Sequence, residues 1–258
     1  CSLTLHSSGA VTIQEDSSTL LSGASTGSSL SLGSTAGITN DASANVGITN
    51  NASFSGTSIT LGTTAGDQMN FGSLTFNSTG AVTIEEDSDM NIAGTNTGGT
   101  TSLTSTGGIS DSSDSSIDVG ALTLNGTSIH LGTGASNTFN ATTLNFNSAG
   151  AVDIAEDSDM DLVGVNTAGS ATLSSTGALS DAGATSLDIT GLGSFSGASI
   201  SLGGGTFNTG SLNFNSAGNV TIQEDSATVL AGSNTAGTLS LTSAGSITDQ
   251  AGTSLAVT

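Results

Sequence analysis

An acidic pair recurs at four places in this chain, and its oxygen atoms could bind a metal ion. Each pair follows a short Val-x-Ile segment and precedes a serine. Carboxylate oxygens together with the carbonyl oxygens of a turn suit Ca²⁺, which takes about 6–8 oxygen ligands. We therefore predict calcium ligands in these acidic turns, which carry extra aspartates in the two middle copies. The candidate ligands are Glu15 and Asp16; Glu86, Asp87 and Asp89; Glu156, Asp157 and Asp159; and Glu224 and Asp225.

A structural interpretation of the same turns is the alternative. Asp and Ser side chains accept hydrogen bonds from nearby backbone N–H groups, and a solvated acidic turn needs no ligand. The glycine-rich nonapeptide that binds calcium in other β-rolls is absent from the sequence. If three coils of a solenoid separate equivalent turns, about 14 Å lies between them, so two turns cannot share one ion. No cofactor other than calcium is predicted.

Paired carboxylates could also hydrolyse glycosidic bonds, which requires an acid with a raised pKa in a substrate cleft. Such clefts use aromatic platforms, but this chain has no Trp or Tyr, and it has no Lys or Arg to stabilise an oxyanion. His6 and His130 do not recur in the other copies. Cys1, the single cysteine, has no recurring base beside it and no partner for an intrachain disulfide. We therefore predict that the chain is not an enzyme, and a polysaccharide-active β-helix is the last alternative.

These residues belong to a repeated pattern of about 70 residues. Val11, Val82, Val152 and Val220 mark one position in each copy. Apolar residues recur at nine stations per copy, mostly as apolar-x-apolar units with a polar residue between them. In the second copy the stations are Leu74/Phe76, Val82/Ile84, Ile92, Leu103, Ile109, Ile117/Val119, Leu124, Ile129/Leu131 and Phe139. The copies span residues 2–72, 73–142, 143–210 and 211–258, and the last one is incomplete.

The spacing of the apolar residues predicts an all-β solenoid. An apolar-x-apolar unit is typical of a strand with one buried face, and the intervening Gly, Asn, Asp and Ser residues turn the chain. Strands this short are not stable as isolated hairpins, but stacked coils can share one core. We predict a parallel β-helix with three short strands per coil, three coils per repeat and about 23 residues per coil. Residues 1–258 would then form one continuous solenoid of about 11 coils.

The charge of the chain excludes several partners. Its formal net charge is −21, and it contains no Lys and no Arg. Nucleic acid and anionic membrane surfaces are bound through basic residues, so neither is an expected partner. No run of about 18 apolar residues is present, and hence no membrane span is predicted. Outward positions mix Thr with Asn, Asp, Ser and Ala, which does not favour a flat ice-binding face.

Self-association is the partner that the pattern favours. The fourth copy stops at Thr258 with about one coil missing, and no capping helix is seen at either end. Open solenoid ends expose unpaired backbone groups. We therefore expect either a longer parent chain or end-to-end association into filaments. Glycans on Ser, Thr or the Asn-x-Ser/Thr triplets are left open by the sequence.

Three segments carry a resemblance to a known family. They are Gly-Ala-Val-Thr-Ile, Ser-Leu-Thr-Ser-Thr-Gly-Gly-Ile at Ser102–Ile109, and Gly-Thr-Ser-Ile-Thr-Leu-Gly at Gly56–Gly62. They resemble repeats of large secreted bacterial surface proteins of the filamentous-haemagglutinin and adhesin kind, and the resemblance covers the whole chain. It implies a right-handed parallel β-helix outside the cell, and it transfers no functional residue. We thus predict a fibre or filament subunit or an adhesin stalk, on a bacterial surface or in extracellular matrix. The alternative is a calcium-dependent surface or matrix binding module.

Overall fold

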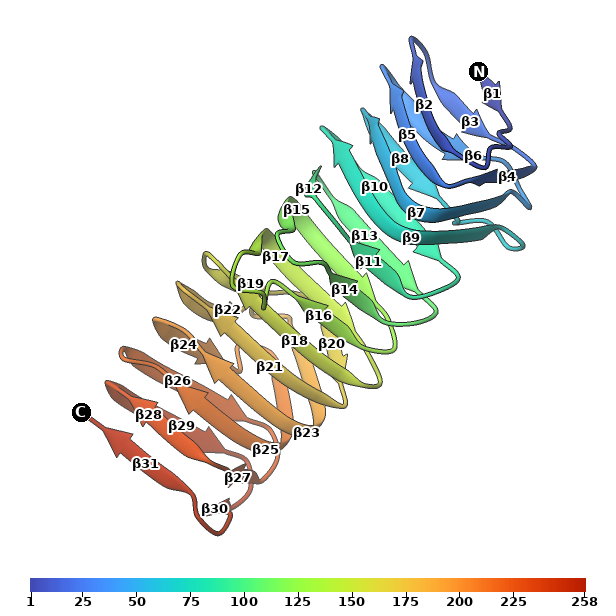
Figure 1. The fold of residues 1–258 in the computed structure, drawn as a ribbon. Coiled ribbons are helices and arrows are strands. Elements are labelled where there is room, and N and C mark those ends of the chain that lie inside the picture. Colours follow the sequence, from blue (N-terminus) through green and yellow to red (C-terminus); the bar gives the residue numbers. More distant parts are fainter. The chain divides into compact units, whose positions relative to one another are not determined.

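The computed structural model describes all 258 residues and is built almost entirely from short parallel strands. It is an all-β parallel β-solenoid of about 12 turns, with about 21 residues per turn. The predicted fold class is therefore confirmed, with turns slightly shorter and more numerous than expected. Figure 1 shows β8 and β10, which pair with each other, side by side in the first part of the chain. No helix is long and apolar enough to cross a membrane.

The chain divides into two compact units, which we describe separately. Unit 1 comprises Cys1–Thr127 with Gly134–Thr138, and unit 2 comprises Ser128–Thr133 with Phe139–Thr258. The strands of unit 1 are β1 Ser2–Leu3, β2 Ala10–Glu15, β3 Thr19–Leu21, β4 Ala24–Gly27, β5 Ser29–Ser34, β6 Gly37–Asn40, β7 Asn45–Gly56, β8 Ser58–Leu61, β9 Gln68–Ser78, β10 Val82–Glu86, β11 Met90–Ile92, β12 Thr95–Gly98, β13 Thr101–Ser105, β14 Ile109–Asp111 and β15 Ser116–Asn125.

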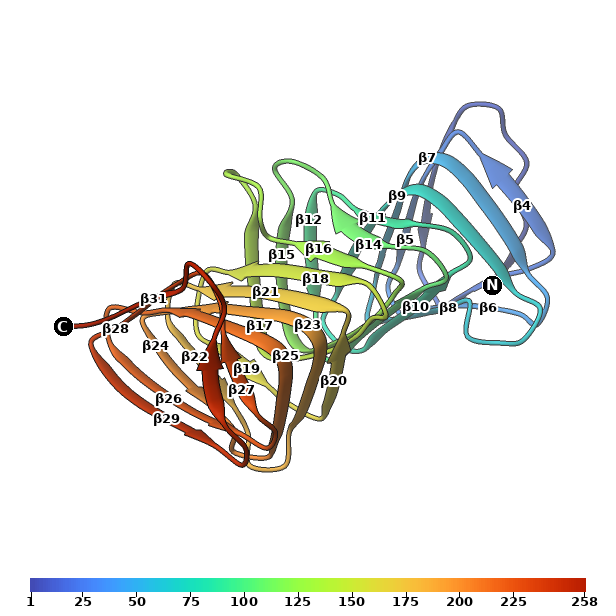
Figure 2. The same ribbon diagram turned by 90° about the horizontal axis from the view of Figure 1, so that it is seen from below.

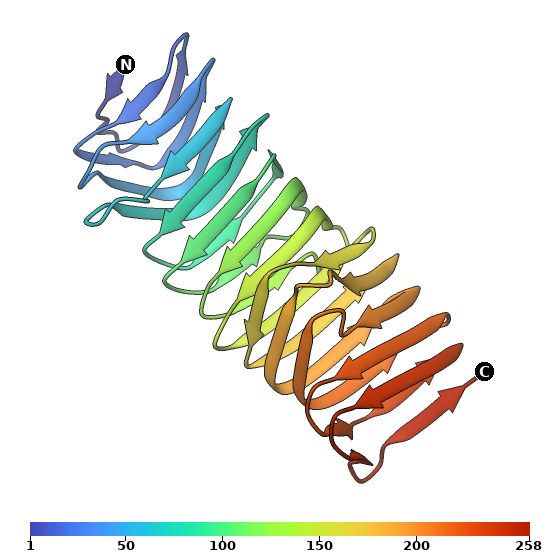
Figure 3. The ribbon, with the colours of Figure 1, turned by 180° about the vertical axis from the view of Figure 1, so that it is seen from behind.

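Unit 2 continues the same pattern of short strands (Figure 3). Its strands are β16 Ile129–Leu131, β17 Thr138–Asn147, β18 Ala151–Glu156, β19 Met160–Leu162, β20 Val165–Ala168, β21 Ser170–Ser175, β22 Ala178–Asp181, β23 Ser186–Ser196, β24 Ser199–Leu202, β25 Thr206–Asn215, β26 Asn219–Glu224, β27 Thr228–Leu230, β28 Ser233–Ala236, β29 Thr238–Ser243, β30 Ile247–Asp249 and β31 Ser254–Val257. The first residue of β17 lies in unit 1.

The ladders of unit 1 correct the predicted number of coils per repeat. Starting from Val11, three ladder steps lead through Leu30 and Ala52 to Leu74. They do not reach Val82, the residue equivalent to Val11, which pairs instead with Ile59 in a different ladder. One sequence repeat is therefore three turns plus part of a fourth, rather than three coils. The cause is that a turn takes about 21 residues, which does not divide the repeat evenly.

Unit 2 shows the same displacement between neighbouring repeats. Three ladder steps from Val152 lead through Ala171 and Gly193 to Leu212. The equivalent residue Val220 lies in the ladder of β22, β24, β26 and β29, which Figure 2 shows side by side. Equivalent motifs in successive repeats thus occupy different ladders of the same unit.

The core consists of the inward residues of these ladders. Most predicted stations are buried, including Leu74, Val82, Phe146 and Leu212, which are all 0% exposed. Burying one such side chain contributes about 1.5–3 kcal/mol. The rings of Phe54 and Phe71 contact each other with centroids 5.6 Å apart. The sequence pattern missed Met90 and Met160, which are fully buried, because neither belongs to a station of Leu, Ile, Val or Phe. The predicted core residues that are exposed are Ile247, Leu255 and Val257, on strands β30 and β31.

Unit 1 has a third ladder besides those that contain Val11 and Val82. In unit 1, β4 pairs with the first part of β7, which pairs with the first part of β9. Figure 2 shows β4, β7 and β9 next to one another. The register of β7 and β9 shifts between Ile48 and Asn51, where the long strands change direction. This three-strand face ends at β9, and its outer edge is where the acidic turn of the second repeat lies.

Candidate functional site

The predicted acidic turns lie directly after strands β10, β18 and β26. Glu86, Glu156 and Glu224 are the last residues of these strands. Their side chains are buried, with 1–2% exposure, whereas Asp87, Asp157 and Asp225 are exposed. The glutamate of each pair therefore belongs to the core, which the sequence analysis did not predict.

Each acidic pair caps the free N–H groups of the preceding long strand. The Oε1 atom of Glu86 accepts a hydrogen bond from the Phe71 N–H at 2.7 Å, and Asp87 Oδ2 accepts one from the Met69 N–H at 2.9 Å. After Asp87 the chain proceeds to β11, whose pairing with β9 is confined to the second part of β9, at Leu74. The first part of β9 consequently lacks a strand on this side, and two carboxylates take the place of the missing backbone carbonyls.

The same caps recur in unit 2. Glu156 accepts from the Ala141 N–H and Asp157 from the Phe139 N–H, both at 2.9 Å. The corresponding bonds of Glu224 and Asp225 come from the N–H groups of residues 209 and 207, also at 2.9 Å. The structural interpretation of the turns is thus supported for three of the four pairs.

Burial leaves each glutamate with one unsatisfied oxygen. The Oε2 atoms of Glu86, Glu156 and Glu224 are buried and have no hydrogen-bond partner. Burial raises the pKa of Glu86 from its ordinary 4.5 to about 7, against the lowering effect of the Phe71 N–H and the Ser88 hydroxyl. Burial likewise raises the pKa of Glu156 to about 7. Neighbouring aspartates raise both values further. These two carboxyl groups are therefore proton-binding groups in the neutral range.

The remaining candidate calcium ligands are Asp89, Asp159, Glu15 and Asp16, and none of them joins a larger group of carboxylates. Asp89 Oδ1 accepts from the Gly108 N–H, and Asp159 Oδ1 accepts from the Ala178 N–H, both at 2.8 Å. Glu15 is the last residue of β2 and Asp16 follows it, and no long strand lies in position to be capped there. Nowhere do three or more His, Cys, Asp or Glu side chains form a group that could hold a metal ion. The structure therefore brings together each pair, but not a larger set, and the calcium prediction for these turns stays a prediction.

Sequence reasoning missed a second recurring cap. Asn96, Asn166 and Asn234 are buried, and the Oδ1 atom of each accepts a backbone N–H bond at 2.9–3.0 Å from residue 76, 146 or 214. The Nδ2 atom of Asn96 donates to the carbonyls of residues 93 and 94. Gly94, at φ +71°, bends the chain there between β11 and β12. The signal available in the sequence was that Asn recurs at one position in three copies.

The two histidines and the cysteine do not converge. His130 Nδ1 lies 3.3 Å from Asp153 Oδ2, and its Nε2 lies 2.7 Å from the Thr133 hydroxyl. His6 forms an isolated bridge with Thr26. The Cys1 thiol is free and exposed. His130 thus has a hydroxyl group on one side and a carboxylate on the other, and this contact lies on the exposed surface of unit 2 and does not recur in the other repeats.

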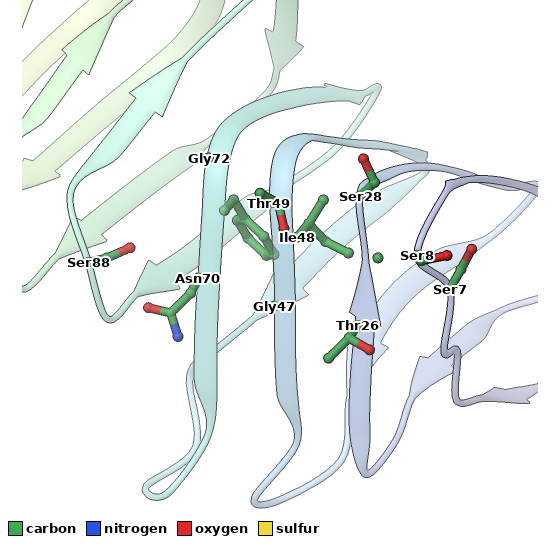
Figure 4. Close-up of a pocket in the computed structure, with 12 residues that line it drawn as sticks. Ser7, Ser8, Thr26, Ser28, Gly47, Ile48, Thr49, Asn70, Gly72 and Ser88 are labelled. Carbon is green, nitrogen blue, oxygen red and sulfur yellow. The ribbon is translucent and has the colours of Figure 1, made fainter.

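A groove of about 770 Å³ lies along the three-strand face of unit 1 (Figure 4). Thr26, Gly47 and Asn70 line it from adjacent strands, and Ser88 of the acidic turn lies at one side. The buried side chains of Ile48 and Phe71 also contribute to its wall. No titratable side chain lines this groove. Its chemistry is limited to hydrogen bonding by hydroxyl, amide and backbone groups and to contact with apolar surface.

Comparison with known proteins gives one match. A family described as "Repeats of unknown function (DUF5649)" matches residues 217–258, which comprise β26 to β31 and include the last acidic turn. The match indicates a repeat and assigns no activity. Neither the curated proteins nor the solved structures contain a significant match to this chain.

Proposed function

We propose that this chain is a structural module of an extracellular fibre or adhesin stalk. The observation that supports this proposal is that the recurring polar residues hydrogen-bond to the backbone of the solenoid. The acidic pairs of three repeats and the asparagines of three repeats are committed to capping backbone N–H groups. Such residues maintain the solenoid, and a catalytic group must instead be free to contact a substrate.

The exterior is consistent with this role. The chain has 21 acidic residues and no basic side chain except two histidines. A large charge of one sign keeps a protein soluble and repels its copies. We infer that association of copies, or attachment to a glycan-containing matrix, uses neutral polar surface such as the groove lined by Thr26 and Asn70. The resemblance of the repeats to filamentous-haemagglutinin-like proteins adds to the case for a bacterial surface location.

Immunogold electron microscopy of producing cells tests the location, with an antibody raised against the 258-residue chain. Label on surface fibres or on matrix is the expected result, and label confined to the cell interior would contradict the proposal. Sedimentation velocity of the purified chain over a range of concentrations tests self-association. Assemblies that grow with concentration are expected for a filament subunit, whereas a constant monomer favours a stalk within a longer chain.

The polysaccharide-active alternative can be tested separately. Incubation of the chain with a panel of polysaccharides, followed by a reducing-end assay, would show no release above the level of heat-inactivated protein. Release that is lost on heating would overturn the structural proposal.

A further inference from the structure

Two corner loops of unit 1 lie against each other and together hold two aspartates. The first loop connects β6 to β7 and contains Asp41, and the second connects β8 to β9 and contains Asp67. The amide Nδ2 of Asn40 donates both to the Asp41 carbonyl at 2.9 Å and to Asp67 Oδ2 at 2.7 Å. The Thr64 N–H donates to the same Oδ2 at 3.0 Å. One asparagine therefore ties the two loops together.

Each aspartate has one buried carboxylate oxygen, Oδ1, without a hydrogen-bond partner. Asp67 is only 7% exposed, and its Oδ1 is buried without a hydrogen bond. The Oδ1 atom of Asp41 is likewise buried and unpaired. A buried carboxylate oxygen without a partner is costly, and this chain has no Lys or Arg that could neutralise the two charges. Two unsatisfied carboxylate oxygens from adjacent loops are chemically suited to a cation.

The equivalent corner of the second repeat has the opposite arrangement. There the aspartate is on the first loop and the asparagine on the second: Asn137 Nδ2 donates to Asp111 Oδ2 at 2.8 Å. The Ser115 hydroxyl donates to the same oxygen at 2.8 Å. Ser112 occupies the position of Asp41. That corner contains a single carboxylate, and neither of its oxygens is unsatisfied.

The aspartate at the equivalent corner of the third repeat has different hydrogen-bond partners. Asp181 accepts from the Gly203 N–H at 3.0 Å and, through both oxygens, from the Gly204 N–H at 3.0 and 3.2 Å. This single carboxylate is fully satisfied by backbone groups. The first repeat is thus distinguished by its second aspartate and by its two unpaired oxygens.

We propose that the corner formed by residues 40–44 and 62–67 binds one divalent cation of the calcium class. Asp41 and Asp67 ligate it through their Oδ1 atoms, and water and loop carbonyls complete the shell. Ca²⁺ suits such a site because it accepts oxygen ligands in irregular geometry, whereas Mg²⁺ demands a near-octahedral set. The site shares no residue with the predicted calcium ligands of the acidic turns.

Calorimetric titration of CaCl₂ into the chelator-treated full chain tests this site. The expected result is one calcium per chain, with affinity in the range of about 10⁻⁴–10⁻³ M that is usual for extracellular modules. The melting temperature should rise by about 3 °C or more at tenfold excess over Kd. The Asp67→Asn variant, which reproduces the chemistry of Asn137, should fold and lose this binding, and Asp41→Ser should weaken it at least tenfold.

Asp118→Asn is the matched control, because it removes one exposed aspartate of the same unit without touching the corner. It should bind calcium like the wild type. Backbone ¹⁵N spectra provide a second measurement, in which calcium should shift the signals of Thr64 and Gly66. Unchanged binding by Asp67→Asn, absence of a calcium response in the wild type, or shifts confined to the acidic turns would each overturn the proposal.

Discussion

The acidic turns of the first and second repeats have the same Glu-Asp-Ser sequence and different surroundings. Glu86 and Asp87 cap the N–H groups of residues 71 and 69, and Glu86 is buried. Glu15 is partly exposed and Asp16 is exposed, and no long strand lies where they could cap it. The comparison teaches that the role of the motif is set by the strand beside it. The same residues are structural in one turn and solvated in the other.

Stability should depend on pH through the buried glutamates, and this is the largest effect that we expect. The folded-state pKa values of Glu86 and Glu156 are about 7, compared with an ordinary 4.5. A raised pKa means that the folded state binds the proton more tightly. The resulting stabilisation is complete below about pH 4.5 and is lost as the pH rises through 7. Each glutamate should contribute at most about 3 kcal/mol to the free energy of unfolding.

Chemical denaturation at pH 5.5 and at pH 8.5, followed by circular dichroism, measures this effect. The double variant Glu86→Gln and Glu156→Gln cannot titrate at these positions and should show a much flatter pH dependence. A wild-type unfolding free energy that is equal at the two pH values would refute the assignment.

Removal of a whole cap should have the next largest effect. The Glu86→Ala and Asp87→Ala double variant leaves the N–H groups of Met69 and Phe71 without their acceptors, which should cost about 2–3 kcal/mol. Hydrogen exchange at these two amides should accelerate more than at the other amides of β9. The matching change of Glu15 and Asp16 to alanine should alter stability by less than about 0.5 kcal/mol, and equal losses in the two variants would contradict the comparison.

Asn96→Ala should cost a similar or slightly smaller amount, about 1–3 kcal/mol, because it leaves the buried Phe76 N–H without its acceptor. Thr95→Ala, one residue earlier on the same strand and exposed, is the control and should be close to neutral. Thermal melts of the two variants at one pH would measure the difference. The role of Asn96 would be refuted if both variants melted at the wild-type temperature.

The smallest expected effect is that of charge alone. Asp225→Asn keeps an oxygen that can accept from the Phe207 N–H but removes the ionised acceptor. Because charge-assisted bonds are roughly twice as strong as neutral ones, the loss should be about 0.5–1.5 kcal/mol. Asp16→Asn should produce no measurable change. Denaturation curves for the two single variants, recorded at pH 8, would test this part of the comparison.

The sequence was sufficient to predict the solenoid and most of its core. Period-two stations such as Val82/Ile84 depend only on the alternation of strand faces, which is a local property. The number of turns per repeat could not be predicted in the same way, because it depends on how many residues each corner consumes. The number of turns per repeat is not whole, and Val82 therefore lies in a ladder other than that of Val11.

The candidate site was predicted only in part. The recurrence of Glu86 and Asp87 was visible, but their burial and their acceptor role were not, because they arise from the absence of a strand beside β9. Asn96 lay between polar residues and gave no apolar signal. The pairing of Asn40 with Asp67 joins two successive turns, so only knowledge of the ladder register could have brought these residues together.

The fractional turn in each repeat limits how such a chain can grow. When one repeat is duplicated within a unit, the strands of the new copy lie in another ladder than those of the original. They must therefore pack against different neighbouring strands. Only strands with interchangeable inward residues tolerate this change, and the Leu, Ile and Val residues at most stations meet that condition. A partner that recognises one side of such an array would encounter a given motif in some copies and miss it in the adjacent ones. Gene duplication therefore alters the spacing of any ligand pattern, while the fold itself is preserved.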